Sequence, residues 1–267
     1  MTTAAYTLHA IPVGALPVPG WEAFFGVNDS AFYDLMFYIW VVTDGETIGL
    51  IDTGLPLDPE ARAALDTANR TLDERATFSD VRTITQALSD LNISGSDIDF
   101  VAITQTITYH TGGLDAAVLP RAHIYLSRAG LTEMLNDPPG HPPVEHYFTA
   151  ASWASIRQFA NDGRLHCVDE PTCVVPGIEF ETTGGHHAGS AGLRIATHDG
   201  VTGLLETAFF DRNVAEGRPI GIAENAALCR SVIQRYKIEC SKVVALHDPT
   251  NARRYPSSTL PQRLALK

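Results

Sequence analysis

The pattern of apolar and polar positions predicts strands in the first part of the chain and alternating strands and helices afterwards. The longest apolar run, Leu35–Val42, has eight residues, which is typical of a strand buried on both faces. Asp44-Gly45 follows it and favours a hairpin turn into a second strand over Thr47–Asp52. Further strands are predicted near residues 99–104, 122–126, 178–182, 193–197, 204–205 and 242–246.

Helix signals lie between these strands. Asp58 and Pro59 supply an N-cap and a proline at the first helical position, which predicts a helix through about Arg70. A second helix near residue 79 is indicated by apolar residues at spacings of 3, 4 and 3: Val81, Ile84, Leu88 and Leu91. Helices are also expected near 150–159 and 224–236. With no boundary signal, residues 1–267 are expected to form one α/β domain in which helices cover sheets.

Composition narrows the classes of function. Of the 267 residues, 19 are Lys or Arg and 31 are Asp or Glu, giving a net charge of −12. This balance argues against binding to nucleic acid or to an anionic membrane surface. No apolar run reaches the roughly 20 residues of a membrane span, and the N-terminus lacks the pattern of a signal peptide.

The four cysteines form no CxxC pair. They are expected to be reduced thiols, which together with the missing signal peptide indicates a cytoplasmic protein. The amino-acid sequence does not indicate whether the protein is a monomer or an oligomer.

Residues that carry chemistry follow three predicted strands. Thr104–Gly113 contains Tyr109 and His110 and ends in Gly-Gly, as a strand-to-helix loop does. His186 lies in the glycine-flanked stretch 184–189, and His247 comes directly after the last predicted strand. Loops of this kind lie at the carboxyl edge of a sheet, where the sites of α/β proteins are usually built.

In their order along the chain, these segments resemble the metallo-β-lactamase superfamily and, within it, the N-acyl homoserine lactonase-like branch. The resemblance covers roughly Phe37–Pro249 and rests on five segments: Gly49–Gly54, Thr104–Gly113, Gly185–Gly189, Leu204–Ala208 and Leu246–Asp248. It implies a four-layer αβ/βα sandwich. It also implies a site at which two metals, held by five His and two Asp, activate the water that opens a lactone.

The residues at the family's ligand positions predict that this two-metal centre is lost. Four of those positions hold other residues: Gln105, Ile107, Tyr109 and Thr207. Ile107 has no donor atom, and Gln105 and Thr207 are poor ligands beside imidazole or carboxylate. Glu206 is expected to face away from the site, because neighbouring strand residues point to opposite sides. The tyrosine that the lactonase-like branch places three residues after the bridging Asp is Phe210 here.

Three interpretations remain for the surviving ligand positions, His110, His186 and His247. They hold a single zinc or other divalent metal, or they act without a cofactor, or they are remnants in a binding protein. The sequence favours the second, with one imidazole as general base and Tyr109 as oxyanion donor. By the resemblance, Asp52 is expected to fix the tautomer of His110.

The residues expected to contact the substrate are Gln105, Ile107, Thr207, Phe210 and His146. His141 and His146, in or beside a Pro-rich loop, are candidates for the cavity entrance, and His187 is expected to be a bystander. The favoured function is a lactonase-like hydrolase, or a related enzyme acting on a carbonyl-containing ring. Its substrate is expected to be small, apolar or aromatic and intrinsically activated, because losing two metals removes charge stabilisation. The alternatives are a cyclase, isomerase or lyase in the same pocket, or an inactive small-molecule-binding protein.

Overall fold

The structure is a computed structural model that describes residues 5–136 and 144–257. Its first sheet has six strands in the order β1-β2-β3-β4-β5-β6. Strands β1 to β3 pair antiparallel, whereas β3 to β6 are parallel. The strands are β1 (Thr7–Pro19), β2 (Phe32–Thr43), β3 (Ile48–Ile51), β4 (Phe100–Ala102), β5 (His123–Ser127) and β6 (Leu165–Val168).

The second sheet has five strands in the order β11-β10-β9-β8-β7. Only the pair of β10 and β11 is parallel, so these two strands end at the same edge. The strands are β7 (Thr172–Val175), β8 (Ile178–Thr182), β9 (Ala191–Thr197), β10 (Gly200–Leu205) and β11 (Lys242–Ala245).

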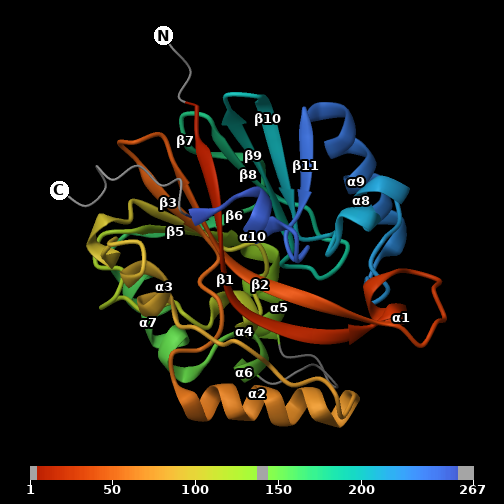
Figure 1. The fold of residues 1–267 in the computed structure, drawn as a ribbon. Helices are drawn as coiled ribbons and strands as arrows, with labels where there is room; N and C mark the ends of the chain where they lie inside the picture. Colours follow the sequence, from red (N-terminus) through yellow and green to blue (C-terminus); the bar gives the residue numbers. More distant parts are fainter. Residues whose placement is uncertain (1–4, 137–143, 258–267) are drawn as a thin grey trace.

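Helices lie on the outer sides of the two sheets (Figure 1). α3 and α7 flank the first sheet, and α8 and α9 flank the second. The helices are α1 (Gly20–Ala23), α2 (Pro59–Leu72), α3 (Ile84–Ser89), α4 (Thr108–Thr111), α5 (Arg128–Asn136), α6 (Val144–Tyr147), α7 (Ala150–Asn161), α8 (Asp211–Glu216), α9 (Ala226–Glu239) and α10 (Asn251–Arg254). Among the described residues, no helix is long and apolar enough to cross a membrane.

The apolar core is divided by the sheets, as the alternation along β2 shows. Phe37 and Ile39 belong to the cluster between the first sheet and its helices. Tyr38 and Trp40, on the opposite face of the same strand, belong to the cluster between the two sheets. A third cluster joins the outer face of the second sheet to α9 through Ile233 and its neighbours. The layers are therefore α/β/β/α, and the expected four-layer sandwich is confirmed.

Local signals explain most of the element boundaries. Asp58 caps α2 by accepting the backbone N–H of Glu60 at 3.0 Å. Thr83 forms a capping box with Gln86, so α3 begins at residue 84, later than expected. The long strand β1 is not among the elements expected from the pattern, because Pro12, Pro17 and Pro19 interrupt it. Prolines are tolerated there because β1 is the edge strand of its sheet.

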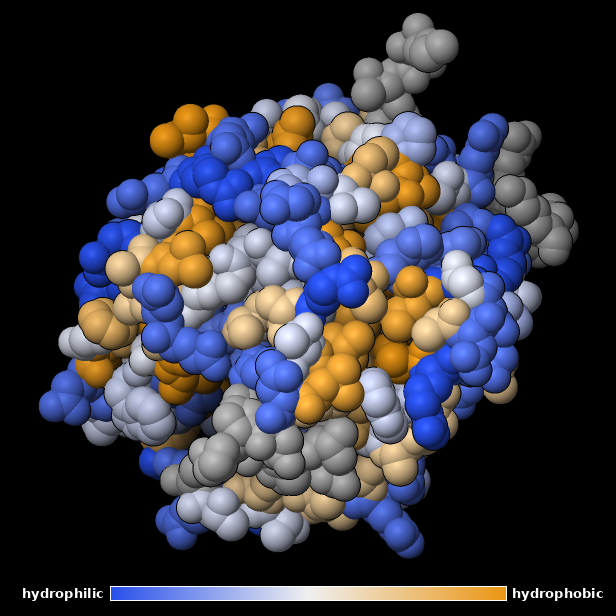
Figure 2. All heavy atoms as spheres, turned by 180° about the vertical axis from the view of Figure 1, so that it is seen from behind, coloured by the Kyte–Doolittle hydropathy of each residue, from blue (hydrophilic) through white to orange (hydrophobic). Residues whose placement is uncertain are grey.

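Surface apolar residues are dispersed on the face turned away in Figure 1. Figure 2 shows several separate apolar patches between hydrophilic side chains on that face.

Candidate active site

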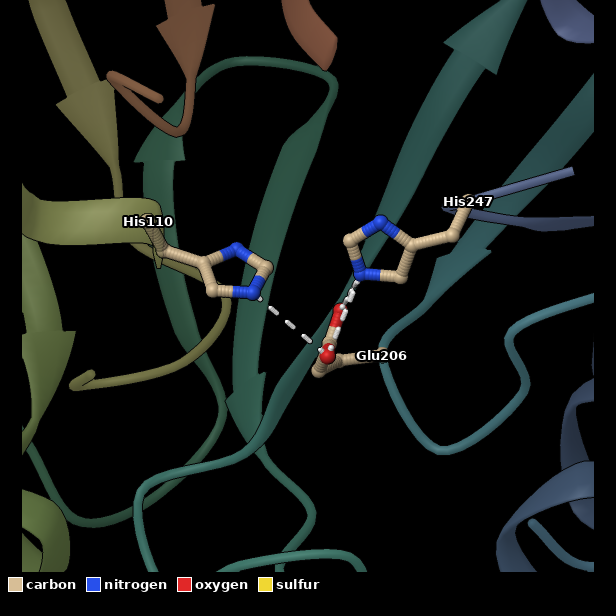
Figure 3. A group of neighbouring side chains, drawn as sticks. All are labelled: His110, Glu206 and His247. Carbon is tan, nitrogen blue, oxygen red and sulfur yellow. Dashed lines mark hydrogen bonds and ion pairs between the residues drawn. The ribbon is translucent and has the colours of Figure 1, made fainter. Parts of the chain in front are cut away.

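The strand ends bring three of the chemistry-bearing segments together. His110 lies on α4, just beyond β4, whereas Glu206 and His247 follow the parallel strands β10 and β11. Figure 3 shows the two imidazole rings on either side of the Glu206 carboxylate. The ring centroids of His110 and His247 are 5.3 Å apart.

Glu206 points into this site, so the expectation that it faces away is wrong. Strand β10 ends at Leu205 and Glu206 already belongs to the following turn, where the alternation of a strand no longer applies. Its carboxylate is fully buried and lies 3.1 Å from Nε2 of His247 and 3.6 Å from Nε2 of His110.

The other nitrogen of each ring, Nδ1, lies within hydrogen-bond distance of an oxygen atom. Nδ1 of His110 lies 2.9 Å from a carboxylate oxygen of Asp52, and Nδ1 of His247 lies 2.8 Å from the carbonyl oxygen of Met36. A carbonyl oxygen only accepts, so Nδ1 of His247 carries the hydrogen. The Asp52 side chain, which also accepts from Thr104, makes the same assignment for His110. Each Nε2 is thereby directed at Glu206.

Asp52 is held in a single orientation. It accepts the backbone N–H of Thr104 at 2.8 Å and the Thr104 hydroxyl at 2.6 Å. Its own φ is 62°, a left-handed conformation that costs an L-residue roughly 1 to 2 kcal/mol. The residue with this unfavourable backbone conformation is the one that contacts the ring of His110, as the sequence resemblance implies.

The buried charges determine the protonation states of the cluster. Burial alone would lower the pKa of His110, but the carboxylates of Asp52 and Glu206 outweigh it and raise the pKa to about 9. Burial would raise the pKa of Glu206, but His247 and His110 outweigh it and lower the pKa, so the carboxylate is ionised. Burial lowers the pKa of His186 to about 4, which leaves this ring neutral near pH 7.

The donor set of the cluster fits one divalent metal. Ligand atoms of His110, Glu206 and His247 lie within 4.8 Å of one another. Zinc bonds of about 2.0 to 2.1 Å in tetrahedral geometry place neighbouring ligand atoms about 3.4 Å apart. The distances from the Glu206 carboxylate to the two Nε2 atoms, 3.1 and 3.6 Å, lie on either side of that value. Because Nδ1 of each ring is held by an oxygen, Nε2 is the nitrogen that faces a metal, and a metal bound there would displace the proton that His110 carries on Nε2 near pH 7. Ile107, in the wall of the neighbouring cavity, has no donor atom and cannot be a metal ligand.

A second group with metal-ligand side chains, Glu133, His187 and Glu224, is less suitable. The backbone N–H of Gly189 donates to Nδ1 of His187 at 3.1 Å. Nε2 of the neutral ring therefore carries the hydrogen, and it faces Glu133 at 3.2 Å. A protonated nitrogen has no lone pair for a metal, so His187 and Glu133 form a polar pair.

A cavity of about 400 Å³ opens beside the Glu206 cluster. Most of the residues expected at the site contribute to its wall: Gln105, Ile107, Tyr109, His110, His146, His186 and His247. His141 lies outside the described residues. Other members of the wall are absent from the residues expected at the site, among them the polar Glu22, Asn69 and Asp73. None of these three stands in a motif, so only the folded chain shows that they belong to the cavity.

Two of the residues expected to contact the substrate, Thr207 and Phe210, do not line this cavity. Thr207 is fully buried outside the cavity wall, because Glu206 takes the inward position at this turn. Phe210 packs into the apolar core with ring centroids 5.5 Å from Phe24 and 5.8 Å from Tyr33. Its neighbour Phe209 lines the cavity instead.

Tyr109 lines the cavity, but its hydroxyl is already engaged. It donates to the amide oxygen of Asn69 at 2.7 Å, and its ring stacks on Phe37 at 5.5 Å. Burial raises the pKa of Tyr109 to about 12, so the phenol stays neutral. To serve as the oxyanion donor expected from the sequence, Tyr109 would have to release Asn69.

Comparisons with known proteins agree with this architecture. No family model matches the sequence, and no curated protein does. Among solved structures, an N-acyl homoserine lactone hydrolase with its product N-hexanoyl-L-homoserine at the catalytic metal centre is 19% identical, with a TM-score of 0.75. The likeness covers 95% of this chain and 97% of that chain.

Two further solved structures are similar over most of their length. A probable metal-dependent hydrolase from Staphylococcus aureus is 15% identical, covers 93% of this chain and 91% of its own, and has a TM-score of 0.70. The hydrolase AbOPH of the beta-lactamase superfamily is 13% identical, covers 94% and 92%, and has a TM-score of 0.65. At these identities the likeness establishes the fold, and the chain therefore has the metallo-β-lactamase fold.

Proposed function

We propose that this protein is a hydrolase of lactone or ester bonds that works with one divalent metal held by His110, Glu206 and His247. One observation carries the proposal: a buried, ionised carboxylate faces two imidazole Nε2 atoms in the wall of a cavity sized for a small molecule. The similar solved structures named as a lactone hydrolase and a metal-dependent hydrolase support it.

The proposed ligand set differs from the one expected from sequence. His186 is replaced by Glu206, and the metal-free mechanism becomes the second choice because the hydroxyl of Tyr109 is bound to Asn69. When bound, the metal supplies a Lewis acid that polarises the scissile carbonyl.

The residues of the chain supply orientation and proton handling. Asp52 and the carbonyl oxygen of Met36 hold the two imidazole rings in one tautomer. His186, neutral and in contact with the edge of Phe209, lies in the same wall, where its unprotonated ring can accept a hydrogen bond from the attacking water and orient it. One water is consumed, the acyl C–O bond breaks, and the products are a carboxylic acid and an alcohol, joined as a hydroxy acid if the substrate is a lactone.

Metal analysis distinguishes the two possible ligand sets. We expect about one zinc, manganese or iron per chain in protein purified without chelator or metal-affinity resin. Glu206→Gln should lose the metal, whereas His186→Asn should retain it. His123→Gln, which removes an exposed imidazole, is the matched control. Metal lost from His186→Asn and kept by Glu206→Gln would reject our ligand set.

Turnover tests the reaction itself. A panel of activated aryl esters and lactones, including strained and aromatic rings, should contain substrates that the metal-loaded protein hydrolyses. Glu206→Gln should slow them by on the order of 100-fold or more, the scale of losing one electrostatic stabiliser. A protein that holds metal, binds members of the panel and hydrolyses none of them would instead be a binding protein.

A further inference from the structure

The charged groups of the cavity wall are predominantly acidic. Four carboxylates line the cavity, and no Lys or Arg is present among the described residues that do so. Two of these carboxylates are compensated: Glu206 by its imidazoles and Asp73 by Arg75 at 3.1 Å. The wall therefore disfavours an anionic substrate.

Glu22 is the carboxylate that stands out. It lies on α1, directly after the apolar end of β1, and shares the wall with Leu16, Val18 and Trp21. Within the described part of the chain, its side chain has no hydrogen bond or ion pair. Burial, with a smaller contribution from Asp73, raises the pKa of Glu22 to about 7. A partly buried carboxylate without a cation beside it marks a position where a ligand can supply one.

Asn69 provides a second, independent sign of a ligand in the same wall. Asn69 is 6% exposed, although the other residues of α2 whose burial is described are half-buried or exposed. Its amide oxygen is occupied by the hydroxyl of Tyr109, but its Nδ2 is buried with no partner among the described residues. Buried amide donors normally find an acceptor, and a polar ligand beside Glu22 would provide it.

We propose that the substrate carries a protonated amine that binds at Glu22, next to an oxygen that accepts from Nδ2 of Asn69. The stacked rings of Phe37 and Tyr109 add ring faces in the same wall that favour a cation. The amine gives the substrate a charge opposite to that of the wall. This inference rests on the proposed function, since it names the class of substrate for the same cavity.

The experiment measures binding without turnover. The probes are N-phenyl amides of ω-amino acids with four to eight carbons, each paired with the N-phenyl amide of the unsubstituted acid of equal length. Calorimetry is carried out on the metal-loaded protein. At one or more lengths the ammonium ligand should bind at least tenfold more tightly than its neutral partner. Glu22→Gln should abolish that preference while leaving the affinity of the neutral ligand unchanged.

Glu74→Gln is the matched control, because it removes the same charge from an exposed residue outside the cavity wall. It should keep the full preference for the ammonium ligand. Equal or weaker binding of the ammonium ligand at every length, no binding of any ammonium ligand, or a preference that survives in Glu22→Gln would overturn the proposal. Because amides are used as ligands and not as substrates, a protein that selects ammonium ligands but hydrolyses no ester would fail only the proposed function.

Discussion

At the scale of single residues, the molecule contains ionisable groups whose state is determined by burial and by a few contacts. Glu22 and Asp52 show the two extremes. Glu22 lies in the cavity wall with no cation beside it, whereas Asp52 accepts from Thr104 and contacts His110. Glu22 should weaken the fold when it ionises, and Asp52 should orient the ring of His110, a proposed metal ligand.

Glu22 gives a pH-dependent prediction. Its pKa rises from 4.5 to about 7 on folding, so the folded chain binds more protons than the unfolded chain between these values. Stability must then fall as the pH rises through this window, by up to about 3 kcal/mol and less in proportion to the residue's partial exposure. Glu22→Gln should therefore gain stability over the unsubstituted protein at pH 8 but not at pH 4. Denaturant unfolding at both values checks this, and a gain of the same size in Glu74→Gln would refute it.

Asp52 gives a prediction about metal affinity. Asn is a near-isosteric replacement that tolerates the positive φ at this position, but it removes the charge that faces His110. Asp52→Asn should weaken metal binding by roughly 10- to 100-fold, as losses of such outer partners typically do. Competition with a chromogenic chelator measures it. Unchanged affinity in a folded variant would mean that Asp52 does not orient His110 toward a metal.

At the scale of elements, each site residue is placed by the end of a strand or by a short turn. The turn before His186 depends on Gly184 and Gly185, with φ of 61° and 90°. A Cβ on Gly185 would lie 2.9 Å from Sγ and 3.0 Å from the backbone nitrogen of Cys229 on α9. Glycine is therefore required there both by backbone conformation and by close approach.

Gly185→Ala and Gly217→Ala separate these two requirements. Gly217 also has a positive φ, of 59°, but a Cβ there meets no atom within 4 Å. We expect Gly217→Ala to cost about 1 kcal/mol of folding free energy and Gly185→Ala distinctly more, since α9 must shift. Thermal unfolding of the two variants tests this. Equal costs would show that the contact with Cys229 contributes nothing.

The same elements show how far sequence reasoning reaches. The double-faced burial of β2 and the cap at Asp58 are local patterns, and both could be predicted. The alternation rule places Glu206 on the wrong face, because β10 ends at Leu205 and the rule no longer applies one residue later. Glu22 and Asn69 belong to no motif and become neighbours of the site only when α1 and α2 are packed against the cavity.

At the scale of the whole molecule, the proposed metal joins the two halves of the sandwich. His110 follows a strand of the first sheet, whereas Glu206 and His247 follow strands of the second. A metal that binds only the folded chain stabilises it by about 2.7 kcal/mol at a free concentration 100 times its dissociation constant. Chelation should therefore lower the melting temperature, and zinc should restore it. Glu206→Gln should show neither response, and a response equal to that of the unsubstituted protein would place the metal elsewhere.

The prolines of β1 have a consequence for how copies of this protein meet. A strand at the border of a sheet invites another chain to extend it, and aggregation can begin there. In β1, Pro12, Pro17 and Pro19 offer no N–H, while backbone groups of Ser79, Arg82 and Tyr255 pair with other positions along the strand. The same prolines that make β1 hard to predict from the sequence therefore also hinder its pairing with a strand of another copy at high protein concentration.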